Sequence, residues 1–246
     1  MTAQSGTTAP QRPAIVGHRG ASAHAPENTL AAFRRAIEDG AQLLECDVHL
    51  SADGHVVVMH DETVDRTAAA ESPLRSGAIG ELTRAELDRV LLPEGERVPS
   101  LEELLAMTTV PVFIEVKAAA AAAAVAQRLR ELDPASPAAG STVISFHAGA
   151  LEEIRRSAHV SVSYLVERID EQAIATATRL GAAGIGPSID GLSLRAAEAV
   201  HEAGLTLNPW TVNSSAQLEV ALACGADSLT TDDPAWIQRE LDVRAG

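Results

Sequence analysis

Cysteines, aromatic side chains and basic residues are all scarce in this sequence. Its two cysteines, Cys46 and Cys224, are far apart and lack metal-ligand spacing, so they indicate two buried thiols and no disulfide framework. There are 19 Lys and Arg against 34 Asp and Glu, which gives a net charge of -15, and the basic residues form no cluster. Such a charge disfavours nucleic acid and anionic lipid surfaces as partners.

Long hydrophobic runs are also missing. No apolar stretch is long enough to span a bilayer, and residues 1–13 have neither the basic nor the apolar part of a signal peptide. We therefore expect a cytoplasmic protein without stable membrane association, in which residues 1–13 form a disordered leader. These features are compatible with either a monomer or a homodimer.

The rest of the chain alternates between β-rich runs and Ala/Leu-rich helical segments, which is typical of repeated βα units around a parallel sheet. The length of 246 residues is close to the roughly 250 of one (β/α)8 barrel. We therefore predict an α/β fold, a single TIM barrel over residues 14–246. Its strands are expected at 14–17, 43–48, 112–116, 142–145, 160–165, 184–189, 206–210 and 228–231.

One segment interrupts this alternation. A turn signal at 51–54 is followed by a strand-like run at 55–60, which indicates a hairpin after the second strand rather than another βα unit. The Pro-, Gly- and charge-rich stretch that follows contains one short helical pattern around 83–90. We predict a small insertion over about 51–100, beside the mouth of the barrel.

The first strand ends in His18 and Arg19, between two glycines. Barrel enzymes place their active sites at the carboxyl ends of the strands. An arginine offers a bidentate fork to two phosphate oxygens, and a histidine exchanges protons near neutral pH. The pair therefore indicates a phosphate site, with a loop of no special role as the alternative.

Two strands carry charged residues at alternate positions. Glu45 and Asp47 on the second strand are two residues apart, and so are Glu115 and Lys117 on the third, so each pair faces one side of its strand. Carboxylates inside a barrel repel each other and lose hydration, and a divalent cation relieves both costs. We predict a metal site of Glu45, Asp47 and Glu115, with Lys117 supplying a positive charge to phosphate. The alternative is a set of interior salt bridges.

A second histidine, His60, follows the hairpin strand. Displacement at phosphorus needs a base for the nucleophile and an acid for the leaving oxygen, and two imidazoles can divide these tasks. The alternative is a rim histidine bonded to the backbone. The sequence assigns no role to the other histidines, which are His24, His49, His55, His147, His159 and His201.

A series of short motifs occurs in order along the chain: His18-Arg19-Gly20, Pro26-Glu27-Asn28-Thr29, Glu45-Cys46-Asp47-Val48, Ser51-Ala52-Asp53-Gly54, His60-Asp61, Asp65-Arg66-Thr67, Glu115-Val116-Lys117, Ser145-Phe146, Trp210-Thr211-Val212-Asn213 and Thr231-Asp232-Asp233-Pro234. Their order and spacing closely resemble the glycerophosphodiester phosphodiesterase family over residues 15–234. The resemblance implies a (β/α)8 barrel with an insertion after the second strand. It also implies hydrolysis of a small-molecule glycerophosphodiester to sn-glycerol 3-phosphate and an alcohol.

The resemblance also implies residue roles. The family's paired catalytic histidines fall on His18 and His60, and its metal carboxylates on Glu45, Asp47 and Glu115, with Mg2+ or Ca2+ as the cofactor. Which histidine is the acid stays open, as does the choice between direct attack by water and a route through a cyclic phosphate.

Substrate-binding roles follow in the same way. Arg19 and Lys117 match positions that neutralise the phosphate, and Glu27 matches a loop that supports His18 or the metal ligands. Trp210 is expected to form an apolar wall against the glycerol or alcohol, or else to be a packed rim aromatic.

Other functions were weighed against this one. A lipid-directed phosphodiesterase of the phospholipase C or D type uses similar side chains, but it works at a membrane surface. A glycosidase needs two carboxylates, yet it would leave both histidines unused, and the chain offers only two Trp, one Tyr and three Phe to stack sugar rings. A barrel that binds a sugar phosphate without turnover has no need of the paired histidines.

Overall fold

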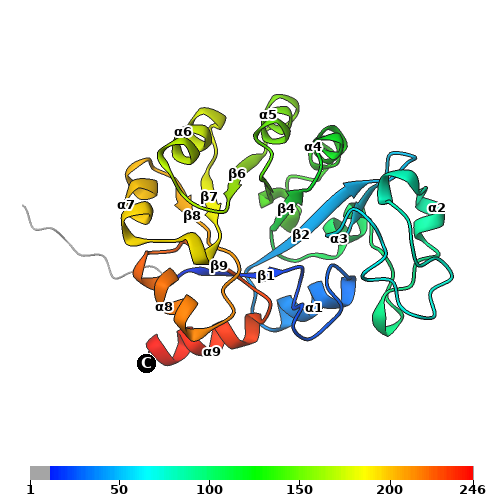
Figure 1. Cartoon of the computed structure of the whole chain (residues 1–246), viewed down its shortest axis with the longest axis horizontal. Helices are drawn as coiled ribbons and strands as arrows, with labels where there is room; N and C mark the ends of the chain where they lie inside the picture. The colour runs from blue at the N-terminus through cyan, green and yellow to red at the C-terminus, as the bar shows by residue number, and fades with distance from the viewer. Residues whose placement is uncertain (1–11, 246) are drawn as a thin grey trace, which may run out of the picture.

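The computed structural model describes residues 12–245, and its parallel strands form a barrel surrounded by helices (Figure 1). The predicted leader lies outside the described residues up to position 11; Arg12 is placed and donates a hydrogen bond to Asp242. The strands neighbour one another in the order β8-β7-β6-β5-β4-β2-β1-β9. They are β1 (Ala14–His18), β2 (Leu43–Leu50), β4 (Val112–Val116), β5 (Thr142–Ser145), β6 (Ser161–Val166), β7 (Gly184–Pro187), β8 (Thr206–Leu207) and β9 (Ser228–Thr231).

Backbone hydrogen bonds also cross the seam between the first and last strands of this order. The N–H of Asp227 donates to the carbonyl of Leu207 at 2.8 Å, and the N–H of Val212 donates to that of Thr230 at 2.8 Å. The regular part of β8 is shorter than predicted because Pro209 has no N–H to donate. The predicted TIM barrel is confirmed.

The helices that cover the barrel are α1 (Leu30–Glu38), α3 (Leu101–Met107), α4 (Ala122–Arg130), α5 (Ala148–Ser157), α6 (Glu171–Leu180), α7 (Leu194–Glu202), α8 (Ser215–Ala223) and α9 (Pro234–Ala245). Side chains of Thr29, Asp170, Ser193 and Ser214 accept backbone N–H groups at the starts of α1, α6, α7 and α8. These caps satisfy donors that have no partner within a helix. In the described residues 12–245, no helix is both long and apolar enough to cross a membrane.

Residues 51–100 form a lobe beside β2. Strand β3 (Val56–Val58) pairs antiparallel with β2, and the short helix α2 (Arg84–Leu87) lies at the outer edge of the molecule (Figure 1). The lobe has its own buried cluster of Val57, Met59, Val64, Ile79, Leu87, Val90, Leu92 and Val98. This small core fixes the end of β3, from which His60 enters the barrel mouth.

Candidate active site

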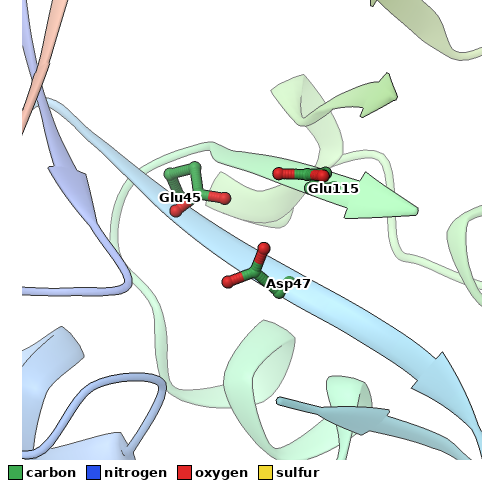
Figure 2. A group of neighbouring side chains, drawn as sticks. All are labelled: Glu45, Asp47 and Glu115. Carbon is green, nitrogen blue, oxygen red and sulfur yellow. The ribbon is translucent and has the colours of Figure 1, made fainter. Parts of the chain in front are cut away.

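Strand register brings three carboxylates together inside the barrel (Figure 2). Glu45 and Asp47 are two residues apart on β2, so strand alternation directs both to the same side. Asp47 pairs in register with Glu115 on β4, while Glu45 pairs with His18 on β1. One oxygen from each of Glu45, Asp47 and Glu115 lies within 4.8 Å of the other two. The structure thus brings the three predicted metal ligands together.

Burial and mutual repulsion oppose full ionisation of this cluster. Burial, together with the charges of Asp47 and Glu115, raises the pKa of Glu45 well above its ordinary value. Burial and the charge of Asp47 also raise the pKa of Glu115. Burial by itself raises the pKa of Asp47 too, but the positive charges of Lys117 and Arg19 outweigh it, and the net shift is downward.

Two cations face the cluster without neutralising all of it. Lys117 Nζ lies 2.9 Å from a Glu115 oxygen and 3.4 Å from an Asp47 oxygen. Arg19 Nε lies 3.3 Å from Asp47, yet it is buried and has no hydrogen-bond partner among residues 12–245. In the same described part of the chain no ion pair reaches Glu45, which accepts the backbone N–H of Arg19 at 2.9 Å. Salt bridges with Lys117 and Arg19 therefore cannot neutralise all three carboxylates. This set of hard oxygen donors fits a divalent cation.

The loop after β1 presents backbone groups to these carboxylates. Arg19 and Gly20 have φ angles of 56° and 85°. A side chain on Gly20 would approach the backbone of Ala32 to 2.5 Å, so only glycine fits there. Asn28, with φ of 56°, donates its side-chain N–H to Asp47 at 2.9 Å. Asparagine is among the few residues that adopt this left-handed conformation readily.

His18 is held by an aspartate from the far end of the chain. Its Nδ1 lies 2.6 Å from Oδ1 of Asp232, which follows β9. A carboxylate only accepts, so Nδ1 carries the proton and Nε2 is the nitrogen left for substrate. Asp232 also accepts from Ser22 at 3.0 Å and from Asn213 at 2.6 Å. These bonds lower the pKa of Asp232, although burial by itself would raise it.

His60 is held in the same manner. Its Nδ1 lies 2.7 Å from Oδ1 of Asp61, which leaves Nε2 free. His49, buried on β2, donates from Nε2 to the backbone carbonyl of His60 at 3.0 Å. This bond fixes the backbone at His60, a role that the sequence did not assign to His49.

A cavity of about 230 Å³ opens over the carboxylates. His18, Arg19, His60 and Lys117 line it together with the metal candidates Glu45 and Glu115. The other walls come from Phe113, Ile144, Phe146, Ser163, Leu165, Glu167, Gly186, Asn208, Trp210 and Thr230. Apart from Glu167, which follows β6, the charged residues of the cavity come from the ends of β1 and β3 and from β2 and β4, while most of the apolar or neutral ones come from β5 to β9.

Trp210 lies in the apolar wall. Its ring packs edge to face on Phe146, with centroids 5.6 Å apart, and its Nε1 donates to the carbonyl of Gly186 at 2.9 Å. The indole is thus a packed rim aromatic that also lines the cavity, and its contact with the glycerol or alcohol stays a prediction. Glu27, by contrast, does not line this cavity; it lies behind Arg19, whose Nη1 donates to it at 3.1 Å.

Several residues around the site had no role predicted from the sequence. Asp61 and Asp232 hold the two histidines, and Asn28 and His49 fix neighbouring groups. Three of these four lay within the family-like motifs, which was the available signal. The pairing of Asp232 with His18 could not be read from the chain, because the two residues are 214 positions apart.

Comparison with known proteins identifies the family. The model of the glycerophosphoryl diester phosphodiesterase family matches residues 18–236, from the last residue of β1 to the first turn of α9. The chain belongs to this family. By class it is a phosphoric diester hydrolase, as the sequence predicted.

Relatives and solved structures agree with this membership. A glycerophosphodiester phosphodiesterase of Caldanaerobacter subterraneus is 31% identical over 228 residues, covering 89% of this chain and 94% of that protein. An Oleispira antarctica phosphodiesterase, solved with its product sn-glycerol-3-phosphate, is 25% identical with a TM-score of 0.85 and covers 94% of this chain and 97% of that one. A glycerophosphodiester phosphodiesterase from Parabacteroides distasonis is 28% identical with a TM-score of 0.81 and covers 95% and 98%.

Proposed function

We propose that this enzyme hydrolyses glycerophosphodiesters to sn-glycerol 3-phosphate and an alcohol, with a divalent cation and two histidines. The observation that carries the proposal is the convergence of three carboxylates within 4.8 Å, on a cavity lined by two imidazoles that aspartates hold. The names of the relatives and the product complex of the Oleispira enzyme support the choice of substrate.

Glu45, Asp47 and Glu115 would hold the cation, for which Mg2+ and Ca2+ are the candidates since all three ligands are carboxylate oxygens. When bound, the cation would supply Lewis-acid chemistry and draw electron density from the phosphoryl group. Arg19 and Lys117 line the same side of the cavity and neutralise phosphate charge there.

His18 and His60 divide the proton transfers. Each donates Nδ1–H to an aspartate and keeps Nε2 for the substrate. One Nε2 takes a proton from the nucleophile, which is either water or a neighbouring hydroxyl of the substrate, and the other, protonated beforehand, gives one to the leaving oxygen. The aspartate beside each ring fixes the orientation of the ring and the nitrogen that carries the proton, and Trp210 excludes water from the opposite wall.

Metal-free protein assayed on a panel of glycerophosphodiesters tests this function directly. We expect no turnover without metal, and release of sn-glycerol 3-phosphate when Mg2+ or Ca2+ is restored, with Mn2+ and Zn2+ tested in parallel. Phosphorus NMR of the reaction distinguishes direct attack from a route through a cyclic phosphate. Full activity after chelation, or no glycerol 3-phosphate from any diester with any of the four metals, would contradict the proposal.

Ser163 gives a prediction about specificity. Its hydroxyl is buried, lines the cavity, and has no hydrogen-bond partner within residues 12–245. It lies in register with Ile144, which in turn pairs with Glu115, so it stands at the level of the metal cluster. We expect it to bond a hydroxyl of the substrate.

A Ser163→Ala variant should therefore lower kcat/KM for glycerophosphodiesters by about 2- to 10-fold, since a hydrogen bond contributes about 0.5–1.5 kcal/mol. Turnover of bis(p-nitrophenyl) phosphate, which has no hydroxyl, should stay unchanged. Equal losses on both substrates would show instead that the residue only packs the wall.

A further inference from the structure

Arg66, from the lobe of residues 51–100, joins two carboxylates at the rim of the active site. Its Nε and Nη2 donate to the two oxygens of Asp61, at 2.6 and 3.1 Å. Its Nη1 and Nη2 donate to the two oxygens of Glu27, at 2.9 and 2.7 Å. All three guanidinium nitrogens are engaged, in two bidentate pairs. Such forks fix geometry more tightly than a single ion pair does.

Each of these carboxylates has a second partner inside the site. Asp61 Oδ1 accepts from His60 Nδ1, and Glu27 Oε1 accepts from Arg19 Nη1 at 3.1 Å. One guanidinium therefore connects the imidazole proposed for proton transfer to the arginine proposed for phosphate binding. His60 enters from the lobe and Arg19 from the loop after β1. Contacts with β2 hold the backbone of each residue, and Arg66 adds a link between their side chains.

We propose that Arg66 is a positioning residue that holds His60 and Arg19 in one fixed arrangement, through Asp61 and Glu27 respectively. The inference rests on the proposed function of the site and adds a residue that touches neither substrate nor metal ligand. Half of the Arg66 side chain is exposed, and exposed ion pairs add little to folding stability. Its value to the enzyme therefore lies in geometry.

The charges of the network are consistent with this role. The hydrogen bond from Arg66 is the largest influence on the pKa of Asp61, and it lowers that pKa. Glu27 is desolvated, which by itself raises its pKa, but its bonds and charges with Arg66 and Arg19 give a net lowering. Both carboxylates therefore stay ionised at neutral pH and keep accepting from both sides.

Three variants separate the link from Arg66 to His60, through Asp61, from the link to Arg19, through Glu27. Asp61→Asn should lower kcat with little change in KM, because it loosens His60. Glu27→Gln should raise KM with little change in kcat, because it loosens Arg19. Arg66→Ala should do both, each by about 10–100-fold, the usual cost of removing a group that orients a catalytic or ligating side chain. Adding Asp61→Asn to Arg66→Ala should cost little more in kcat.

Arg244 provides the matched control. It also bridges two carboxylates, Glu219 and Glu240, but on α8 and α9. Arg244→Ala should leave kcat and KM unchanged. Free guanidinium at millimolar concentration should partly restore Arg66→Ala, since the site is open to solvent, whereas methylammonium should not. Wild-type kinetics for Arg66→Ala, or additive losses in the double variant, would overturn the proposal.

A readout without turnover keeps this inference separate from the proposed function. In 15N-histidine NMR spectra, the Nδ1 proton of His60, assigned by its loss in His60→Ala, should be protected in the wild type by the bond to Asp61. In Arg66→Ala it should broaden and exchange faster, while the Nδ1 proton of His18 stays as it was. An unchanged His60 signal in Arg66→Ala would overturn the proposal even if the enzyme acted on another diester. Inactivity of the wild type on every glycerophosphodiester would affect only the proposed function.

Discussion

Replacing His18 by alanine is expected to lower kcat on glycerophosphodiesters by roughly 10²–10⁴-fold, the usual contribution of one general acid or base. The imidazole lines the cavity, and Asp232 occupies its Nδ1, so Nε2 is the only ring nitrogen free to exchange a proton with substrate. Alanine removes that nitrogen and leaves the three carboxylates in place. Substrate binding should therefore change much less than turnover, and steady-state kinetics with separate kcat and KM values measure this.

His24 offers a matched control on the same rim. It also pairs with an aspartate, since its Nε2 lies 3.1 Å from Asp233, but it does not line the cavity. His24→Ala should keep wild-type kinetics. Asp232→Asn, which keeps the size of the side chain but loses the charge that faces His18, should lower kcat by about 10–100-fold. Unchanged turnover in His18→Ala would contradict the proposed catalysis by two histidines.

Replacing Glu45 by glutamine is expected to have opposite effects on stability and on metal binding. The raised pKa values of Glu45 and Glu115 mean that the folded, metal-free protein binds protons more tightly than the unfolded chain does. Its stability should therefore fall as the pH rises above the ordinary value of 4.5, toward the raised values. Glutamine removes one of the repelling charges, so metal-free Glu45→Gln should be more stable than the wild type at neutral pH. The gain should be about 0.5–2 kcal/mol, as for other relieved active-site strain.

The same variant should bind Mg2+ or Ca2+ more weakly, by more than the roughly 10–100-fold that loss of an outer-shell group costs. Activity at a fixed metal concentration should fall accordingly. Thermal unfolding with and without metal measures both effects. Without metal, Glu45→Gln should be the more stable protein. A metal concentration of 100 times Kd should stabilise the wild type by about 2.7 kcal/mol, and the same concentration should stabilise Glu45→Gln much less. The exposed Glu94, remote from the cluster, supplies a control in Glu94→Gln.

Lys117 supplies an independent probe of that cluster, because it is the only lysine in the chain. Labelling with 15Nζ-lysine should give a single ammonium signal, from a group 2.9 Å from Glu115. Metal titration should shift this signal in the wild type and in Glu94→Gln, but at much higher concentration in Glu45→Gln. A metal-independent Lys117 signal, together with unchanged metal affinity in Glu45→Gln, would mean that these acids form salt bridges only.

Local pattern predicted much of this architecture. Eight β-rich runs with helices between them were enough to predict the barrel. The positions of His18, Glu45 and Glu115 on their strands predicted that these side chains lie at the mouth of the barrel. Strand alternation has a period of two, so it fixes which side chains share a face. The strand predicted at 206–210 was too long, because regular strand structure ends at Leu207, before Pro209.

The sequence by itself determined the fold class, the residue types of the site and the family, since these depend on short-range spacing and on the order of motifs. Only the tertiary structure decided which groups hold the histidines and that one guanidinium joins Asp61 to Glu27. Those contacts link residues 39 positions apart for Arg66 and Glu27, and 214 for His18 and Asp232. Hydrogen bonds depend on distances of about 3 Å and on direction, and closure of the barrel sets both, whereas spacing along the chain does not.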